Sequence, residues 1–401
     1  MAQDQRGRGR RRVLAAIRKA GRIARVDLAK ATDISQATVT TITAELIQKG
    51  LIEETVRDAA AEDMKRGRPR VALKVRGEAH VVAGMKLSDN ALSAVLVDFA
   101  NTLLAETQIT LPRASFEAGH LATILADALD DLVTQAGMTR EDVAAIGLGL
   151  PGVVDGRNGV VQWSPSLDRK GVDLRRIVSD HLGMPAFVDN DANLVAVAEQ
   201  YYGRGRDAQD FLVVTVEQGV GMGIVQRNEV YRGQHGYGAE FGHTKVTLDG
   251  APCRCGQKGC LEAYVADYAL VREAAQVLAL PDGMSHRDKL LRLIEAAKGG
   301  DAAAQRIIDH AGRMFVMGLA NLVNIFDPEL IIISGEQMQF DYLVNEAALQ
   351  GIRQYVVQRD QQLPEIVINK WGDLMWARGA AVYAIDGVAG IALIEMSHNA
   401  A

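Results

Sequence analysis

All three cysteines of this 401-residue chain lie within eight positions, at Cys253, Cys255 and Cys260. His243 stands ten residues before the first of them. Three thiolates and one imidazole suit Zn²⁺, because this ion accepts sulfur and nitrogen ligands in a tetrahedral arrangement. Reduced thiols beside an unrelated histidine are the alternative, but a chain that is otherwise free of cysteine and gathers every thiol in one glycine-containing segment favours the metal. A closed set of four protein ligands predicts one structural zinc per chain.

The residues around these ligands form a pair of motifs. Glu240-Phe-Gly-His243 is followed by Cys-x-Cys-Gly-x-x-Gly-Cys-x-Glu, which ends at Glu262. The pair resembles the signature of the ROK family, which is named for repressors, open reading frames and sugar kinases. The resemblance implies that Glu240, His243 and Glu262 contact a sugar, while the same histidine and the three cysteines hold zinc.

Length and composition predict a multidomain cytoplasmic protein. A chain of 401 residues that is 48% hydrophobic can build two or three domains with cores of their own. We find no uninterrupted apolar run of about 18 residues, and no hydrophobic signal segment follows the arginine-rich start. Cysteines that serve a metal agree with a reducing compartment. We therefore expect a cytoplasmic location and no membrane contact.

The net charge of -6 conceals an uneven distribution. Residues 1–76 contain 18 Lys and Arg against 9 Asp and Glu, a balance of +9, whereas the remainder contains 26 against 41, a balance of -15. A basic module on an acidic body predicts that the amino-terminal end meets a polyanion. Nucleic acid is the main candidate in the cytosol.

The amino-terminal module shows the pattern of a three-helix domain. After a basic tail, Val13, Leu14 and Ile17 recur at helical spacing, and residues 26–30 indicate a second short helix. Ser35 can cap a third helix, because its hydroxyl can accept a hydrogen bond from a free amide of the first turn. On that helix the apolar residues at positions 39, 42 and 46 share one face, and short polar side chains occupy the other.

Two strand patterns, 51–55 and 71–75, follow the helices and flank a basic tip, Arg66-Gly-Arg-Pro-Arg70. The tip places arginines beside a proline of fixed φ, which suits insertion into a minor groove. A small helical bundle with solvated arginines is the alternative, but charge, capped helix and basic tip together predict a winged helix-turn-helix that binds operator DNA. The predicted DNA-contacting residues are Ser35, Gln36, Thr38, Thr40, Thr41, Arg66, Arg68 and Arg70. The module resembles the one that ROK repressors carry and stand-alone ROK sugar kinases lack.

From about residue 77 a strand pattern replaces the helical one. Three apolar runs at 81–85, 91–97 and 102–106 are joined by turn signals and predict an antiparallel meander. A helix with an apolar face over 121–132 and an apolar strand at 144–150 follow it.

The meander recurs at 211–216, 222–226 and 229–232, which indicates an internal duplication. Two such α/β halves describe the actin/hexokinase-like (RNase H-like) two-lobed fold, which is the ROK body. Further elements are predicted as a helix with Leu319, Leu322, Val323 and Ile325, a strand at 330–333 and a closing helix from Ala377. The predicted domains are residues 1–76, residues 77–195 with the C-terminal helix 377–401, and residues 196–376 with the zinc motif.

Two hairpin turns help to separate a kinase from a sensor, because they hold the phosphates of ATP in hexokinase-like folds. ROK sugar kinases carry Asp-x-Gly-Gly-Thr in the first turn, where this chain has Lys86-Leu-Ser-Asp89-Asn90. A cation replaces the carboxylate that serves Mg²⁺, and Asp89 adds an anion where phosphate would enter. The second turn, 219–223, keeps glycines that admit an anion, although glycines also make tight hairpins. Because Ser334-Gly-Glu336 departs from the family's adenosine contact as well, we expect that ATP binding is lost.

The sugar-binding motif is intact by resemblance. Asn190 and Asp191 match the family's Asn-Asp-Ala-Asn motif, in which both bind sugar hydroxyls and the aspartate is the catalytic base of the kinases. A carboxylate and an amide together suit a vicinal diol, so Asp191 is expected to be a vestigial base that still contacts ligand. An Asx-turn at the start of a helix is a compatible structural explanation. Ser166 stands where family members often have a sugar-contacting asparagine, which leaves the identity of the sugar open.

These observations predict a sugar-responsive transcriptional regulator of the repressor type. Its hexokinase-like sensor is expected to bind a sugar or sugar phosphate, in a kinase-like cleft, through Asn190, Asp191, Glu240, His243 and Glu262. Family resemblance implies a homodimer or homotetramer. An ATP-dependent ROK sugar kinase with an added DNA-binding domain is the alternative, and a regulator that senses a partner protein is a third class.

Overall fold

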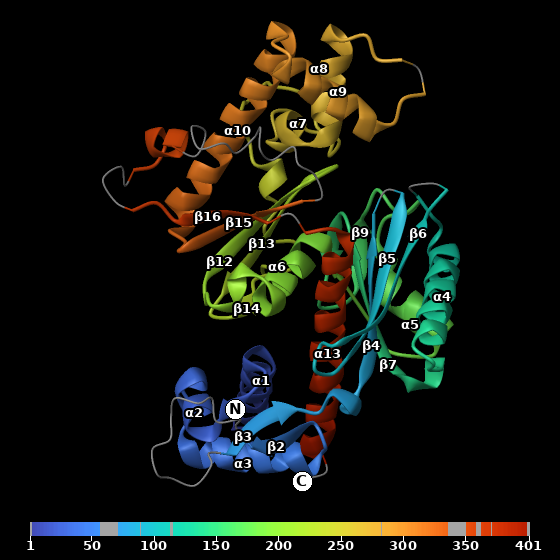
Figure 1. Ribbon diagram of the computed structural model, residues 1–401, viewed down its shortest axis with the longest axis vertical. Helices are drawn as coiled ribbons and strands as arrows, with labels where there is room; N and C mark the ends of the chain where they lie inside the picture. The colour runs from blue at the N-terminus through green and yellow to red at the C-terminus, as the bar shows by residue number, and fades with distance from the viewer. Residues whose placement is uncertain are drawn as a thin grey trace. The chain divides into compact units, whose positions relative to one another are not determined.

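The computed structural model describes residues 2–56, 71–88, 90–112, 115–281, 283–335, 350–357, 362–369 and 371–398. The chain divides into two compact units, Met1–Asp191 with Trp376–Ala401 and Ala192–Met375. The first unit holds the amino-terminal module and one large sheet, and the second holds the other large sheet and the cysteine segment (Figure 1). The finer domain boundaries near residues 76, 195 and 376 stay a prediction.

The amino-terminal module is a winged helix-turn-helix, as predicted. Its elements are α1 (Ala2–Ala20), β1 (Ile23–Ala24), α2 (Arg25–Thr32), α3 (Gln36–Gln48), β2 (Ile52–Val56) and β3 (Val71–Val75). β3 lies between β1 and β2 and is antiparallel to both. The apolar faces predicted for α1 and α3 are buried. The strand β1 was not predicted, because two residues are too few to show alternation.

The first unit also contains a five-stranded mixed sheet in the order β11-β7-β4-β5-β6. Its strands are β4 (Val81–Leu87), β5 (Ala91–Asp98), β6 (Leu103–Thr110), β7 (Val143–Leu150) and β11 (Ala186–Asn190). The strands β4, β5 and β6 form the predicted antiparallel meander, and β7 and β11 run parallel to β4 on its other side.

Helices cover both faces of this sheet. The helices α4 (Ala118–Gln135) and α5 (Leu174–Leu182) lie on one face, and α13 (Asp373–His398) lies on the other (Figure 1). The smaller elements are η1 (Gly77–Ala79), η2 (Arg140–Asp142) and a sheet of β8 (Val153–Asp155), β9 (Val160–Trp163) and β10 (Val172–Asp173).

The helix α13 packs so closely on the sheet that two strand glycines have no room for a side chain. A Cβ on Gly84 of β4 would stand 2.2 Å from the carbonyl oxygen of Ala377, and a Cβ on Gly147 of β7 would stand 1.9 Å from that of Ala380. The backbone of the helix therefore rests directly on the two strands.

α13 is also the one helix among the described residues that is long and apolar enough to cross a membrane, over Leu374–Glu395. Arg378 and Asp386 interrupt this stretch, which is why the sequence shows no uninterrupted apolar run. Because 56% of an 18-residue window of this stretch is buried within the protein, α13 is a core helix of the first unit and gives no evidence for a membrane.

The second unit repeats the arrangement of the first. Its sheet has the order β14-β13-β12-β15-β16. The strands are β12 (Phe211–Val216), β13 (Val220–Gln226), β14 (Glu229–Val230), β15 (Leu330–Ser334) and β16 (Glu365–Asn369). In both sheets the first strand is central, with an antiparallel meander on one side and two parallel strands on the other. This equivalence confirms the internal duplication and the hexokinase-like fold.

Helices also cover the second sheet. The helix α6 (Asp191–Tyr202) packs on one face, and the other face shares a hydrophobic core with α7 (Glu262–Val265), α8 (Asp267–Val277), α9 (His286–Lys298) and α10 (Ala302–Phe326). Three 3-10 helices, η3 (Arg204–Arg206), η4 (Phe241–His243) and η5 (Ile352–Gln354), complete the described part.

The predicted helix with Leu319, Leu322, Val323 and Ile325 is α10. Leu319, Leu322 and Val323 are buried, but Ile325 is 71% exposed. At about 100° per residue, six positions carry Ile325 roughly 240° around the helix from Leu319. Ile325 therefore lies on the exposed side of α10.

Close packing of α13 on the sheet makes a stability prediction. Gly147→Ala should lower the free energy of unfolding by about 1–3 kcal/mol, because the new methyl group meets a backbone carbonyl that cannot move aside alone. Gly390→Ala is the matched control on α13, since nothing lies within 4 Å of its added Cβ. The control should leave stability unchanged or raise it by up to about 1 kcal/mol. Thermal and denaturant unfolding measure both, and equal stabilities of the two variants would contradict the packing account.

Candidate metal centre and recognition surfaces

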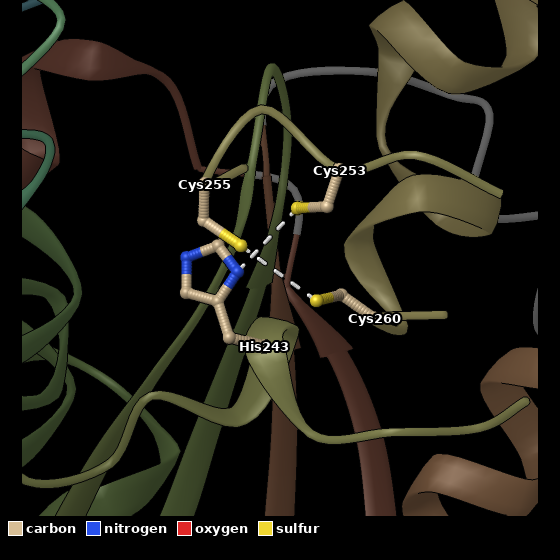
Figure 2. A group of neighbouring side chains, drawn as sticks. All are labelled: His243, Cys253, Cys255 and Cys260. Atoms are coloured by element: carbon tan, nitrogen blue, oxygen red, sulfur yellow. Dashed lines mark hydrogen bonds between the residues drawn. The ribbon is translucent and has the colours of Figure 1, made fainter. Parts of the chain in front are cut away.

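The four predicted metal ligands come together in the second unit. His243 ends η4, and Cys253, Cys255 and Cys260 lie on the loop that leads to α7. The imidazole and the three thiols point toward one another (Figure 2). His243 Nδ1 lies 3.6 Å from Cys253 Sγ, Cys255 Sγ lies 3.7 Å from Cys260 Sγ, and the four ligand atoms all lie within 4.8 Å of one another.

These separations fit one tetrahedral metal ion. With a Zn–S distance of about 2.3 Å, two sulfur ligands at tetrahedral positions stand about 3.8 Å apart. Two of the thiols, Cys253 and Cys260, are buried, and Cys255 is exposed. The cluster can therefore hold a metal with four protein ligands, and its three sulfurs and one nitrogen suit zinc chemically.

Two polar neighbours of the thiols were missed at the sequence level. The Lys245 ammonium donates to Cys260 Sγ at 2.9 Å, and the Tyr268 hydroxyl donates to Cys253 Sγ at 3.7 Å. Such donors stabilise metal-bound thiolates. Neither residue is part of the cysteine motif, so their contacts with the thiols become visible only in the folded structure. Without a metal, burial raises the pKa of the Cys253 thiol well above its ordinary value.

The sugar contacts predicted for the second unit lie beside the same cluster. Glu240 Oε2 stands 4.0 Å from His243 Nε2, the ring nitrogen other than the one facing Cys253. Glu262 is 8% exposed and accepts a hydrogen bond from the Val220 amide at 3.3 Å through Oε2. Its Oε1 lies 3.4 Å from the Tyr268 hydroxyl, whose single proton is shared between this oxygen and Cys253 Sγ. Glu262 thus joins the metal cluster to the hairpin between β12 and β13.

The sugar contacts predicted for the first unit lie where β11 meets α6. Asn190 ends β11, and its Nδ2 donates to the Gly152 carbonyl oxygen at 2.7 Å. Asp191 is the first residue of α6 and is half-buried. In the same unit Ser166 is fully buried, and its hydroxyl has no hydrogen-bond partner among the described residues. A buried hydroxyl in this situation is a candidate contact for a polar ligand.

Lys86 lies inside β4, so the first hairpin turn is shorter than predicted. Its side chain is buried, and its ammonium stands 4.0 Å from the centre of the Trp376 ring on α13. Ser88 closes the turn by donating from both its amide and its hydroxyl to the Ala91 carbonyl oxygen. Asp89 lies outside the described residues. The cation that replaces the expected carboxylate is thus held against an aromatic face.

Two glycines of the second turn have a packing explanation. A Cβ on Gly221 would stand 2.9 Å from the Ala192 Cβ of α6, and one on Gly223 would stand 2.6 Å from the Ala196 Cβ. Gly219 lies in the turn itself, where a Cβ would stand 3.1 Å from a carboxylate oxygen of Glu262. Packing against α6 therefore accounts for Gly221 and Gly223 without a phosphate.

The helix α3 presents the predicted polar face. The Ser35 hydroxyl accepts a hydrogen bond from the Thr38 amide at 3.2 Å and so caps the helix. The exposed polar residues are Ser35, Gln36, Thr38, Thr40 and Thr41. The hydroxyls of Thr40 and Thr41 donate to backbone carbonyls one turn earlier, and their oxygens keep acceptor capacity. The basic tip with Arg66, Arg68 and Arg70 lies outside the described residues.

Fold and site together define a class of protein. A winged helix-turn-helix is joined to a duplicated hexokinase-like body that carries a Cys₃His cluster. The chain belongs to the ROK family, whose model, described as "ROK family", matches residues 82–386. A second model, described as "Winged helix-turn-helix DNA-binding", matches residues 10–53.

Individual relatives include both regulators and kinases. The xylose repressor of Caldicellulosiruptor bescii is 30% identical over 346 residues, which are 84% of each chain. A crystal structure of a ROK family transcriptional regulator, described as a homologue of the E. coli MLC protein, is 28% identical, covers 98% of both chains and superimposes with a TM-score of 0.77. A ROK hexokinase from Thermus thermophilus is 32% identical with a TM-score of 0.64, and it covers 76% of this chain and 97% of its own. This regulator therefore matches nearly the whole chain, whereas the hexokinase matches about three quarters of it.

The metal cluster makes a prediction about pH. Apparent affinity for added Zn²⁺ should be higher at pH 8 than at pH 6, because protons compete with the metal for the thiolates, most strongly at Cys253 with its raised pKa. Competition against a chelator at the two pH values measures this.

Cys255→Ser should lose bound metal and lower the melting temperature, whereas Thr247→Ser, an exposed change in the same loop, should do neither. Affinity that does not change with pH, or full metal content in Cys255→Ser, would contradict the ligand assignment.

Proposed function

We propose that this protein is a sugar-responsive transcriptional regulator of the repressor type. One observation carries the proposal: the likeness to a ROK transcriptional regulator extends over 98% of both chains and includes the DNA-binding module, whereas the ROK hexokinase covers 76% of this chain. The relative named as a xylose repressor supports a sugar as effector. A regulator of this kind works in the cytoplasm, and we propose that location.

We propose that α3 reads operator DNA in the major groove. In helix-turn-helix proteins the amino-terminal residues of the second helix of the motif contact base edges, and in this protein that helix is α3. Here those positions carry Gln36, Thr38, Thr40 and Thr41, all exposed, on a helix whose start is fixed by the Ser35 cap. The arginines at 66, 68 and 70 are proposed to contact the minor groove beside it. A homodimer or homotetramer would place two such modules on a near-palindromic operator.

We propose that the effector is a sugar or sugar phosphate. Its contacts are assigned to Asn190, Asp191, Glu240, His243 and Glu262 by their match to the family motifs. The buried Ser166 hydroxyl, which has no partner among the described residues, is added as a contact that bears on which sugar is bound. A hydroxyl-rich ligand suits such a group, because it can both donate to and accept from a serine.

We propose that the metal is one structural Zn²⁺ per chain, held by His243, Cys253, Cys255 and Cys260. Four protein ligands leave no open position for a reacting water. Zinc would join the loop after η4 to the start of α7 and so fix the segment that carries Glu240 and Glu262.

We propose that the kinase-like body has lost ATP binding. By resemblance to the ROK sugar kinases, the carboxylate that serves Mg²⁺ would stand where Lys86 lies, and a buried ammonium against Trp376 opposes the metal electrostatically. The second turn gives no support for a phosphate, since packing against α6 explains Gly221 and Gly223. Asp191 would then serve as a ligand contact without acting as a base. Sugar-dependent ATP turnover that disappears in Asp191→Asn would instead identify the kinase alternative.

Operator recognition by α3 is the test of the proposed function. The wild-type protein should select one sequence from a random DNA pool and prefer its own upstream region. Gln36→Ala should weaken binding to the selected DNA by about 1–3 kcal/mol and relax the base preference at one position. Gln48→Ala is the control, because Gln48 is exposed at the other end of α3. No selection by the wild type, or equal effects of the two variants, would contradict the proposed function.

A further inference from the structure

One buried arginine joins the DNA-binding module to the rest of the first unit, here called the first lobe, which consists of the sheet β11-β7-β4-β5-β6 and its helices α4, α5 and α13. The side chain of Arg18, near the end of α1, is 1% exposed and forms an ion pair with Asp386 of α13. Its Nη2 also donates to Asn101 Oδ1 at 3.2 Å, and its guanidinium lies 5.9 Å from the centre of the Phe99 ring. Asp386 is 368 positions away in sequence, and Phe99 and Asn101 lie at the turn between β5 and β6. A single guanidinium therefore contacts two separate segments of the lobe.

The helix α13, which carries Asp386, is packed tightly against the sheet of the first lobe. The backbone of α13 rests on Gly84 and Gly147, as described above. Beside Asp386, a Cβ on Gly387 would stand 2.2 Å from the Phe187 ring of β11. Close packing of this kind leaves a helix no separate motion from its sheet. Asp386 is therefore held at a fixed position relative to the sheet.

On the side of the DNA-binding module, α1 is also bonded to α3, the helix proposed to read the operator. Arg10, also on α1, is 4% exposed, and its Nε donates to Glu45 Oε2 of α3 at 2.8 Å. A buried, charge-assisted hydrogen bond fixes geometry more firmly than an exposed one. The helix α1 is thus held to the lobe through Arg18 and to α3 through Arg10.

We propose that Arg18 and Asp386 are positioning residues for operator binding, and this inference rests on the proposed function. Their contact holds the module, and with it α3, in one orientation on the first lobe. Specific binding requires α3 to meet base edges in a fixed geometry, whereas non-specific binding depends mainly on the positive charge of the module. Loss of the contact should therefore reduce affinity for the operator and leave affinity for random DNA nearly unchanged.

The sign of the effect of Asp386→Ala distinguishes a positioning role from a purely electrostatic effect on DNA binding. Asp386→Ala removes a negative charge, which by itself strengthens attraction to DNA, whereas loss of the contact weakens operator binding. Asp386 lies outside the module and is half-exposed, so its replacement removes no phosphate contact and leaves no large cavity. Asp130→Ala is the matched control, because Asp130 is an exposed carboxylate of the same lobe that pairs with Arg140.

The experiment uses full-length protein and the DNA that the wild type selects from a random pool. Asp386→Ala and Arg18→Ala should each lower affinity for the selected DNA roughly 10-fold, and Asp130→Ala should change it less than about twofold. The double variant should lose no more than Arg18→Ala alone, because both changes break one contact. Circular dichroism and melting temperature check that each variant is folded.

Three results would overturn the inference. The first is an Asp386→Ala protein that binds the selected DNA as tightly as wild type does, the second is a double variant in which the effects of the two single variants add, and the third is a loss of affinity for random DNA as large as the loss for the operator. Either of the first two results would mean that the contact does not position α3, and the third would mean that the variants act through charge or folding. A wild type that selects no DNA at all is a different result, since it rejects the proposed function itself and the positioning role with it.

Discussion

The contact between the α13 backbone and the central strands β4 and β7 is the constraint on which the first unit depends. Gly84 and Gly147 admit the helix at a distance that no side chain would allow. Because the helix is fixed there, the other residues of α13 are held at fixed positions as well. Trp376 stands over the buried Lys86, and Asp386 meets Arg18 of the DNA-binding module. A single packed helix thus relates Lys86 and the amino-terminal module to one sheet.

In the second unit the corresponding constraint is the Cys₃His cluster. Its histidine has two neighbours of different kinds, since Nδ1 faces a thiol and Nε2 faces the carboxylate of Glu240. A metal on Nδ1 would set the orientation of the ring and with it the position of Glu240. Glu262 is held from the other side by the Val220 amide and the Tyr268 hydroxyl. The proposed sugar contacts of this unit therefore lie on a segment that the metal would stiffen.

Much of this could be predicted because the signals are local. The Cys₃His cluster follows from spacing, the capped α3 from Ser35 and its apolar stripe, and the duplication from two meanders of similar pattern. Contacts between distant segments could not be predicted in this way. Nothing in the sequence pairs Arg18 with Asp386, puts Trp376 over Lys86, or explains Gly221 and Gly223 by α6.

Sugar-dependent operator binding tests the central claim most directly. Affinity for the selected DNA would be measured with and without each member of a panel of pentoses, hexoses, amino sugars and their phosphates. One of them should change the affinity by about 5–150-fold. Asp191→Ala should abolish that change and leave affinity in the absence of sugar as in wild type, because Asp191 lies outside the DNA-binding module. An Asp191→Ala protein that still responds as the wild type does would show that the effector binds elsewhere.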